Sequence, residues 1–354
     1  MSTFRGAFRR FVLLGGALAA VAFASRPAAA DDQLTVVAGA QPTAFYQVID
    51  HVAIRGGFYK AEHLDVTEEY AGNPVIAAQL LASGKGDISA EALEPLIQGY
   101  DKGVHLVAFF ARSPRYQYAL GVLDSSPIRT LADFKGATIG EYSPGNPGEY
   151  STSSLLEGAG LKRSDFSFIP IGNGAQAIQA MTSGKVAGAA FPYLELLIYE
   201  VNAGQKYRLF HHPILADIVD TGFVTTPAMI ANKPDILRRF SRAVAKASIL
   251  VRVNPQLAAR YYLEGSGQKV TPEAIANETK LFGVAADQLP GYYPLSKRIG
   301  DIPEAGMGVL AKFLYDAGVV NEVLPTSTIM TDQFIDYAND FDHKAFVAQA
   351  KLMH

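Results

Sequence analysis

The fold of this chain is decided by a stretch that occurs twice, NPVIAAQLLASGK at residues 73–85 and NGAQAIQAMTSGK at residues 173–185. Six of the thirteen positions are identical, including the closing Ser-Gly-Lys. In each copy three positions lie at helical spacing, and the glycine that follows is typical of a helix C-terminus. A short strand is expected next in each copy, at 87–90 and 187–190. The shared order of helix, cap and strand therefore predicts two domains of the same construction.

The repeat extends upstream of the helix. Residues 34–39 predict a buried strand, followed by a turn at 41–43 and a helix that starts near Phe45. In the second half the strand is 137–140, and a turn at 143–148 leads into the next helix. A period of about one hundred residues is too long for a solenoid. It fits two α/β domains, each with alternating strands and helices around a mixed, mostly parallel sheet.

The chain has to cross between these domains twice. The first crossing is expected at residues 112–115, and the second near residues 223–230, after which the pattern is mainly helical. We therefore expect one lobe from residues 31–115 plus 225–354, which includes the C-terminal helices, and a second lobe from residues 116–224.

The first thirty residues have the pattern of a signal peptide. A basic start with Arg5, Arg9 and Arg10 precedes an uncharged apolar run over residues 11–24, and three alanines end the segment at Ala30. The apolar run is shorter than the ~20 residues that span a bilayer. We expect cleavage near Ala30 and export to the periplasm. The arginine pair fits a twin-arginine signal or an ordinary secretory signal.

Composition excludes several classes of protein. The chain has 31 basic and 34 acidic residues, and without residues 1–30, which hold four arginines, the balance is 27 to 34. Such a mildly acidic surface argues against nucleic acid as a partner. The chain has no cysteine, so a lipid-anchoring Cys, a thiol nucleophile and a Cys-ligated metal are all excluded.

Enzyme motifs are missing as well. Neither Ser-Gly-Lys segment is a P-loop, because no Ser or Thr follows the lysine. The segment after Gly140 is not a Gly-x-Ser-x-Gly nucleophile elbow. The seven histidines are scattered without metal-ligand spacing. We expect no catalytic residues, no metal and no cofactor.

Two loops suit the capture of a small molecule. In parallel α/β sheets ligands lie beyond the carboxyl ends of the strands, against helix N-termini with free N–H groups. Each repeat supplies one such loop, at 39–46 and at 140–151. The polar candidates are Gln41, Thr43, Asn146 and Ser151, and the aromatic candidates are Phe45, Tyr46 and Tyr142. Alternatively, Thr43 and Ser151 are only helix N-caps and Phe45 is only a core residue.

The loop after the second strand of each repeat adds further candidates. The first copy has Glu91 where the second copy has Phe191, and Tyr193 follows. A Glu91 that faces a cleft would select a ligand with hydrogen-bond donors or positive charge. Arg112, at the first crossing, would select an anion. These two signals conflict, so the charge of the ligand stays open.

The same segments resemble one family, the nitrate, taurine, sulfonate and thiamine-pyrimidine-precursor type of ABC substrate-binding proteins. The resemblance is carried by residues 56–66 (GGFYKAEHLDV), 80–88 (LLASGKGDI) and 130–136 (TLADFKG), and it covers residues 33–340. It implies a type II periplasmic-binding fold, closure about a hinge, and delivery of the ligand to a membrane permease with its ATPase. The ligand residues that it implies lie at 41–46, 89–91, 112–113, 142–151 and 191–193, and these include Ser89.

This sequence also departs from the family pattern. Many relatives have Trp at the position of 191–193 and a Gly-Ser-Thr type of loop in the second lobe. This chain has no Trp, and residues 143–148 read SPGNPG. The departure puts a simple sulfonate or nitrate ligand in doubt and leaves room for an aromatic or heterocyclic one.

We therefore expect a monomeric periplasmic receptor for a small organic solute, with aromatic or anionic solutes such as a sulfonate, an aromatic carboxylate or a pyrimidine as the candidates. One alternative is a sensory receptor with a signalling partner, whose binding chemistry would be the same. Another is an enzyme similar to thiamine-pyrimidine synthases, but those enzymes use a Cys-rich iron motif that this chain lacks.

Overall fold

The computed structural model describes residues 30–113, 115–215, 218–284 and 298–354. Its contacts separate Met1–Ala30 from Asp31–His354, and the second unit is described below. The expected signal peptide lies outside the described residues apart from Ala30, and it stays a prediction. Within the described ranges, no helix is long and apolar enough to span a lipid bilayer.

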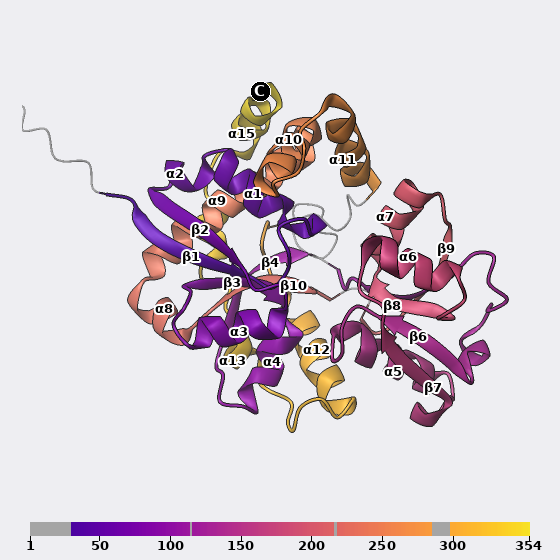
Figure 1. The fold of residues 1–354 in the computed structure, drawn as a ribbon. Helices are drawn as coiled ribbons and strands as arrows, with labels where there is room; N and C mark the ends of the chain where they lie inside the picture. The colour runs from indigo at the N-terminus through magenta and orange to yellow at the C-terminus, as the bar shows by residue number, and fades with distance from the viewer. Residues whose placement is uncertain (1–29, 114, 216–217, 285–297) are drawn as a thin grey trace, which may run out of the picture. The chain divides into compact units, whose positions relative to one another are not determined.

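The first half of the repeat belongs to a five-stranded mixed sheet (Figure 1). The order across this first sheet is β2 (Leu64–Tyr70), β1 (Asp32–Ala38), β3 (Ile88–Ala92), β10 (Thr221–Thr225) and β4 (Val107–Ser113). Strand β1 is parallel to β2 and β3, whereas β10 runs antiparallel to β3 and β4. Strands β3, β4 and β10 are buried along their whole length, as expected for short apolar runs covered on both faces.

The second half of the repeat forms a sheet of the same plan. Its order is β7 (Phe166–Pro170), β6 (Ala137–Glu141), β8 (Gly188–Pro192), β5 (Tyr118–Leu123) and β9 (Tyr207–His211). Strand β6 is parallel to β7 and β8, and β5 runs antiparallel to β8 and β9. The prediction of two similar α/β domains with mixed sheets is confirmed. Each sheet contains two parallel and two antiparallel pairings.

The repeated segment itself forms α3 (Pro74–Ala82) and α6 (Gly174–Thr182), each followed by the expected strand. Both helices end at a glycine with a left-handed backbone, Gly84 at φ 74° and Gly184 at φ 73°. A backbone N–H beyond each glycine donates back into the last turn: Lys85, the next residue after Gly84, donates to the Leu80 carbonyl, and Val186, two residues after Gly184, donates to the Ala180 carbonyl. Only glycine adopts this conformation without strain, which explains why Ser-Gly recurs at this point.

The two crossings differ in how well the sequence predicted them. Strand β4 ends at Ser113 in the first sheet and β5 starts at Tyr118 in the second, in agreement with a crossing at 112–115. The return occurs earlier than expected, because Thr221–Thr225 already pairs with β3 and β4. The expected boundary at 224/225 therefore cuts through a strand of the first sheet. A five-residue strand carries no local sign of the sheet to which it belongs.

Helices cover both sheets. Those near the first sheet include η1 (Phe45–Gln47), α1 (Val48–Arg55), α2 (Phe58–Ala61), α4 (Glu94–Tyr100), α8 (Pro227–Asn232), α9 (Pro234–Val253), α10 (Pro255–Gly265), α11 (Pro272–Val284), α12 (Glu304–Asp316), α13 (Thr326–Ile329), α14 (Ile335–Asn339) and α15 (His343–Leu352). The second sheet is accompanied by η2 (Leu131–Phe134), α5 (Pro147–Gly158), η3 (Arg163–Asp165) and α7 (Tyr193–Ala203).

The C-terminal helices complete the core of the first sheet (Figure 1). One face of α9, with Phe240 and Val244, packs in the same cluster as Val36 of β1 and Phe109 of β4. Leu310 of helix α12 packs with residues of β4 and α4 in a second hydrophobic cluster. Both helices lie in the part of the chain after the second crossing, which the sequence predicted to be mainly helical, and each buries one apolar face.

Candidate ligand-binding site

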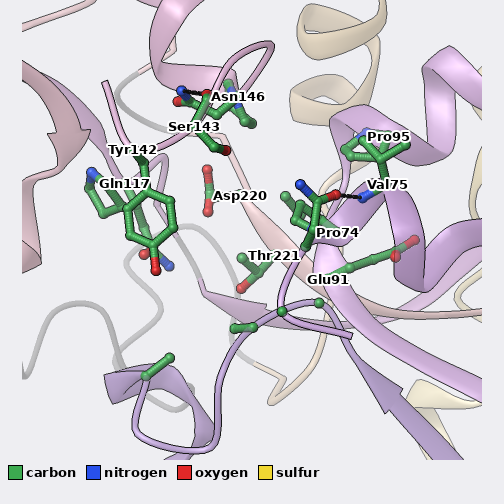
Figure 2. Close-up of a pocket in the computed structure, with 18 of the residues that line it drawn as sticks. Pro74, Val75, Glu91, Pro95, Gln117, Tyr142, Ser143, Asn146, Asp220 and Thr221 are labelled. Atoms are coloured by element: carbon green, nitrogen blue, oxygen red, sulfur yellow. Dashed lines mark hydrogen bonds between the residues drawn. The ribbon is translucent and has the colours of Figure 1, made fainter. Parts of the chain in front are cut away.

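A cavity of about 430 Å³ is lined by residues from both sheets (Figure 2). From the first sheet come the loop after β1 at residues 39–44, the start of α3, and residues of β3 and β4. From the second come residues 142–147, which directly follow β6. Both loops lie at carboxyl ends of parallel strands, the position where open α/β sheets bind ligands. The two loops that the repeat predicted therefore meet at one cavity.

Helix α3 begins at this cavity, but its N-terminal N–H groups are already occupied. Its first residue, Pro74, has no N–H. The Asn73 side chain accepts hydrogen bonds from the next two backbone N–H groups, Val75 at 2.8 Å and Ile76 at 3.2 Å. This N-terminus therefore offers little to an anion, contrary to the expectation of free N–H groups.

N-terminal N–H groups of α5 and α6 in the second lobe also have hydrogen-bond partners within the protein. Helix α5 also starts with a proline, Pro147, and the Asn146 side chain accepts from the Gly148 N–H at 2.7 Å. At α6 the Gly174 N–H donates to the Tyr199 hydroxyl at 2.7 Å. At α3 and α5 these N–H groups are bound within the protein, whereas Asn173 forms no side-chain cap at α6.

Arg112 of β4 supplies the guanidinium of the cavity lining, and its charge is matched. The side chain is 1% exposed, forms an ion pair with the buried Asp50, and donates to Gln47 Oε1 and to the Tyr46 carbonyl, both at 3.0 Å. Burial raises the pKa of Asp50 to about 6 and Arg112 opposes the rise, so the pair is ionised at neutral pH. The guanidinium also lies 4.9 Å from the centre of the Phe223 ring.

Two buried carboxyls face the same cavity. Asp220, next to the start of β10, is 2% exposed, and Glu91 of β3 is 3% exposed. Desolvation raises the pKa of Asp220 to about 7 and that of Glu91 to about 8. Glu91 accepts a hydrogen bond from the Ser89 hydroxyl at 2.9 Å. Among the described residues, neither carboxyl forms an ion pair, and Asp220 Oδ1 and Glu91 Oε1 have no hydrogen-bond partner.

Tyrosines form much of the remaining wall, namely Tyr46, Tyr118, Tyr142 and Tyr150. The Tyr142 hydroxyl accepts a hydrogen bond from the Asn173 amide at 2.9 Å, which ties the ring to the start of α6. A Tyr150 hydroxyl 3.5 Å from Gln98 Nε2 links α5 with α4, and so joins the second lobe to the first. The wall therefore offers aromatic faces together with polar tips.

Seven of the twelve ligand residues predicted from the sequence line this cavity: Gln41, Thr43, Tyr46, Glu91, Arg112, Tyr142 and Asn146. Their contact with a ligand stays a prediction. The geometry does bring them together from loops that are a hundred residues apart in the sequence.

The other five do not line the cavity. Phe45 is 5% exposed and packs edge-on against Phe282, as the core alternative proposed. Phe191 is fully buried, edge-on to Tyr142 and Tyr199. The other three are Ser89, which donates to the Val37 carbonyl; Ser151, whose hydroxyl donates to the Gly148 carbonyl; and Tyr193, edge-on to His211. These side chains hold the wall in place from behind, because each has its contact within the protein.

Several residues of the lining were not predicted from the sequence. Asp220 is one of them, because the second crossing was expected near residues 223–230, whereas Asp220 already precedes β10 of the first sheet. Asn73 and Asn173 could have been found, because they are an identical pair of the repeat and both line the cavity. Glu195 and Gln117 gave no local signal. Among the described residues, no group of three acidic or His side chains could hold a metal ion.

The paired sheets, the crossings and the cavity between their loops define a two-lobed type II periplasmic-binding fold. A family model described as "NMT1/THI5 like" matches residues 45–258, and the chain belongs to this family.

Individual relatives are more distant. The riboflavin-binding protein RibY of Chloroflexus aurantiacus is 24% identical over 213 residues, which cover 59% of this chain and 59% of that protein. A solved structure from Bordetella bronchiseptica RB50 is 22% identical, with a TM-score of 0.70, over 88% of this chain and 98% of that one. The alkanesulfonate-binding protein SsuA from Xanthomonas axonopodis pv. citri, solved with MOPS, has 15% identity and a TM-score of 0.65 over 86% and 100%. These structures support the fold alone.

Proposed function

We propose that this chain is the solute-binding component of an ABC importer and captures a small organic solute in the cavity between its lobes. The observation that supports the proposal is that equivalent loops of the two repeats, at residues 39–44 and 142–147, line one and the same cavity. Two of the relatives described above are named for the binding of riboflavin and of alkanesulfonates, which agrees with a binding role. The proposed place of action is the periplasm, as a monomer that delivers its ligand to a membrane permease and its ATPase.

Capture proceeds by closure of the lobes about the two crossings. The first crossing lies between β4 and β5, and the second ends at Asp220. A ligand that contacts both walls stabilises the closed state by its preference for that state. The lobes in this proposal are residues 31–115 plus 221–354 and residues 116–211. They are joined on the return by residues 212–220, of which Leu215, Ile218 and Val219 pack in the core of the first lobe.

The test is ligand binding by the chain from Asp31 onward, measured as a rise in melting temperature with riboflavin, benzenesulfonate and benzamidine as probes. A ligand that binds only the folded state raises the melting temperature by mass action. Small-angle X-ray scattering of the same samples should show a smaller radius of gyration when the ligand is bound.

Variants of each wall identify the cavity as the site. We expect Tyr46→Ala in the first lobe and Tyr142→Ala in the second each to weaken the binding of the effective probe about three- to tenfold, from the loss of one aromatic contact. Gln176→Ala is the control, because this residue is exposed on α6 and does not line the cavity. Unchanged affinity in both tyrosine variants would contradict the site. If no probe bound at all, the receptor function would lose its support.

A further inference from the structure

We propose that the cavity selects a solute with positive charge or several N–H donors on a planar ring, and that Asp220 is the residue that binds these donors. This inference rests on the proposed function and specifies its class of ligand. Four observations carry it: the charges of the lining, the state of the helix N-termini, the surroundings of Asp220, and the aromatic wall.

The charges of the lining favour a donor-rich ligand. Three acidic side chains line the cavity, Glu91, Glu195 and Asp220, against one basic side chain, Arg112. The guanidinium is already paired with Asp50 outside the lining. Within the described part of the chain, the three acids form no ion pair. The lining therefore holds more acidic than basic side chains, and each of these acids opposes a bound anion when it is ionised.

The capped N-termini of α3 and α5 give an anion little compensation. As described above, α3 and α5 begin with proline and are capped by Asn73 and Asn146, and the Gly174 N–H of α6 is bound by Tyr199. Arg112 keeps its Nε and Nη1 groups without a partner among the described residues, and these can donate to one acceptor atom of the ligand. Such an arrangement suits a neutral or cationic ring that carries donors on one edge and an acceptor on another.

One carboxylate oxygen of Asp220 is available to accept a hydrogen bond from a ligand. Its carboxylate accepts a hydrogen bond from the Gln117 backbone, and Oδ1 has no partner among the described residues. Figure 2 shows the carboxylate in the middle of the cavity, between Ser143 of the second lobe and Thr221 of the first. A buried carboxyl without a partner is destabilising unless a hydrogen bond or a cation compensates it. A ligand that donates to Oδ1 supplies this compensation.

Desolvation of the carboxyls makes the preference dependent on pH. The raised pKa of Asp220, about 7, means that this group is partly protonated at neutral pH when no ligand is bound. A cation favours the ionised form, so its affinity should rise between pH 6 and pH 8. The other charged groups of this lining are Glu91 next to the Ser89 hydroxyl, Glu195 and Arg112. The buried Glu94 of α4 does not line the cavity, but it also interacts with Asp220, and burial together with this neighbour raises the pKa of Glu94. The tyrosines of the wall add faces on which a cationic ring can lie.

The experiment compares three probes of one-ring size at pH 6 and pH 8: benzamidine as a cation, cytosine as a neutral donor, and benzenesulfonate as an anion. We expect benzamidine and cytosine to raise the melting temperature more than benzenesulfonate does, with the larger benzamidine effect at pH 8. Asp220→Asn should weaken benzamidine binding about 10- to 100-fold, the usual effect of a hydrogen bond to a charged group, and should not weaken benzenesulfonate binding.

The matched control is Glu278→Gln, which removes another acid whose pKa burial raises to about 7 but which does not line the cavity. It should leave all three affinities unchanged. The unliganded Asp220→Asn protein should melt at the same temperature as the wild type or higher, because a buried unpaired acid is removed. An equal loss for all three probes would show a merely structural role for Asp220.

Preferential binding of benzenesulfonate would overturn the proposed class of ligand while leaving the receptor function intact. Failure of every probe, riboflavin included, would instead contradict the receptor function itself. The two failures are therefore distinguishable.

Discussion

The two copies of the repeat share a backbone but not the chemistry of their side chains. Glu91 and Phe191 occupy the same position, the fourth residue of β3 and of β8, and both are buried. Asn73 caps α3 with its side chain, whereas Asn173 leaves α6 uncapped and donates to the Tyr142 hydroxyl. At this position the first lobe therefore has a buried acid, whereas the second lobe has an aromatic side chain that packs on Tyr142 and Tyr199. The difference shows how one fold, used twice, gives equivalent positions with unlike chemistry.

The largest expected effect is the difference in stability between variants of Phe191 and of Glu91. Phe191→Ala should lower the free energy of unfolding by about 3–5 kcal/mol, because it leaves a cavity in a packed cluster with Tyr142 and Tyr199. Glu91→Gln at pH 5, where the acid is protonated, should change this free energy by less than about 1 kcal/mol. Denaturant titration of both variants measures the contrast. A cost below 1 kcal/mol for Phe191→Ala would show that the aromatic is not part of the core.

The next effect depends on pH. Burial raises the pKa of Glu91 to about 8, so the folded chain keeps a proton that the unfolded chain loses at its ordinary pKa near 4.5. The folded state binds more protons across this window, and stability therefore falls as the pH rises through it. Glu91→Gln should reduce the loss of stability between pH 5 and pH 8 by on the order of 3 kcal/mol. Phe191→Leu is the control and should keep the wild-type pH dependence; an identical profile for Glu91→Gln would refute the prediction.

The smallest effect concerns the paired asparagines. Asn73→Ala should lower the free energy of unfolding by about 1 kcal/mol, because two N–H groups of α3 lose their cap. Asn173→Ala should have less effect on stability, since the side chain does not cap α6 and is exposed. Thermal unfolding of both variants tests the difference. Equal losses would mean that the two helix starts are energetically alike despite their hydrogen bonds.

Several parts of the fold followed from local sequence signals. The helix of each repeat, its glycine end and the strand after it are specified by residues adjacent in the chain, so their prediction needed no tertiary information. The candidate site was predicted in part. Gln41, Tyr46, Tyr142 and Asn146 follow the carboxyl ends of predicted strands, and the direction of parallel strands decides where those ends lie.

Other features had no local signal. Whether Phe191 faces the cavity or the core depends on α7 and on the loop after β6, whose Tyr199 and Tyr142 both pack on its ring. Tyr46 and Phe45 are neighbours in one turn, yet the first lines the cavity and the second packs on Phe282 of a distant helix. Asp220 depends on the pairing of β10 with β3 and β4, a contact between segments about 130 residues apart.

By itself, the sequence determined a two-lobed α/β protein with matched loops, because a repeat of helix, cap and strand repeats the same local preferences. It also determined the kinds of residue in those loops, including the absence of cysteine and tryptophan. Only the tertiary structure decided that Arg112 pairs with Asp50, and that the side chains of Asn73 and Asn146 cap the N-termini of α3 and α5. The physical reason is that burial and pairing set the charge of a cavity, and both depend on segments that meet only when the chain is folded.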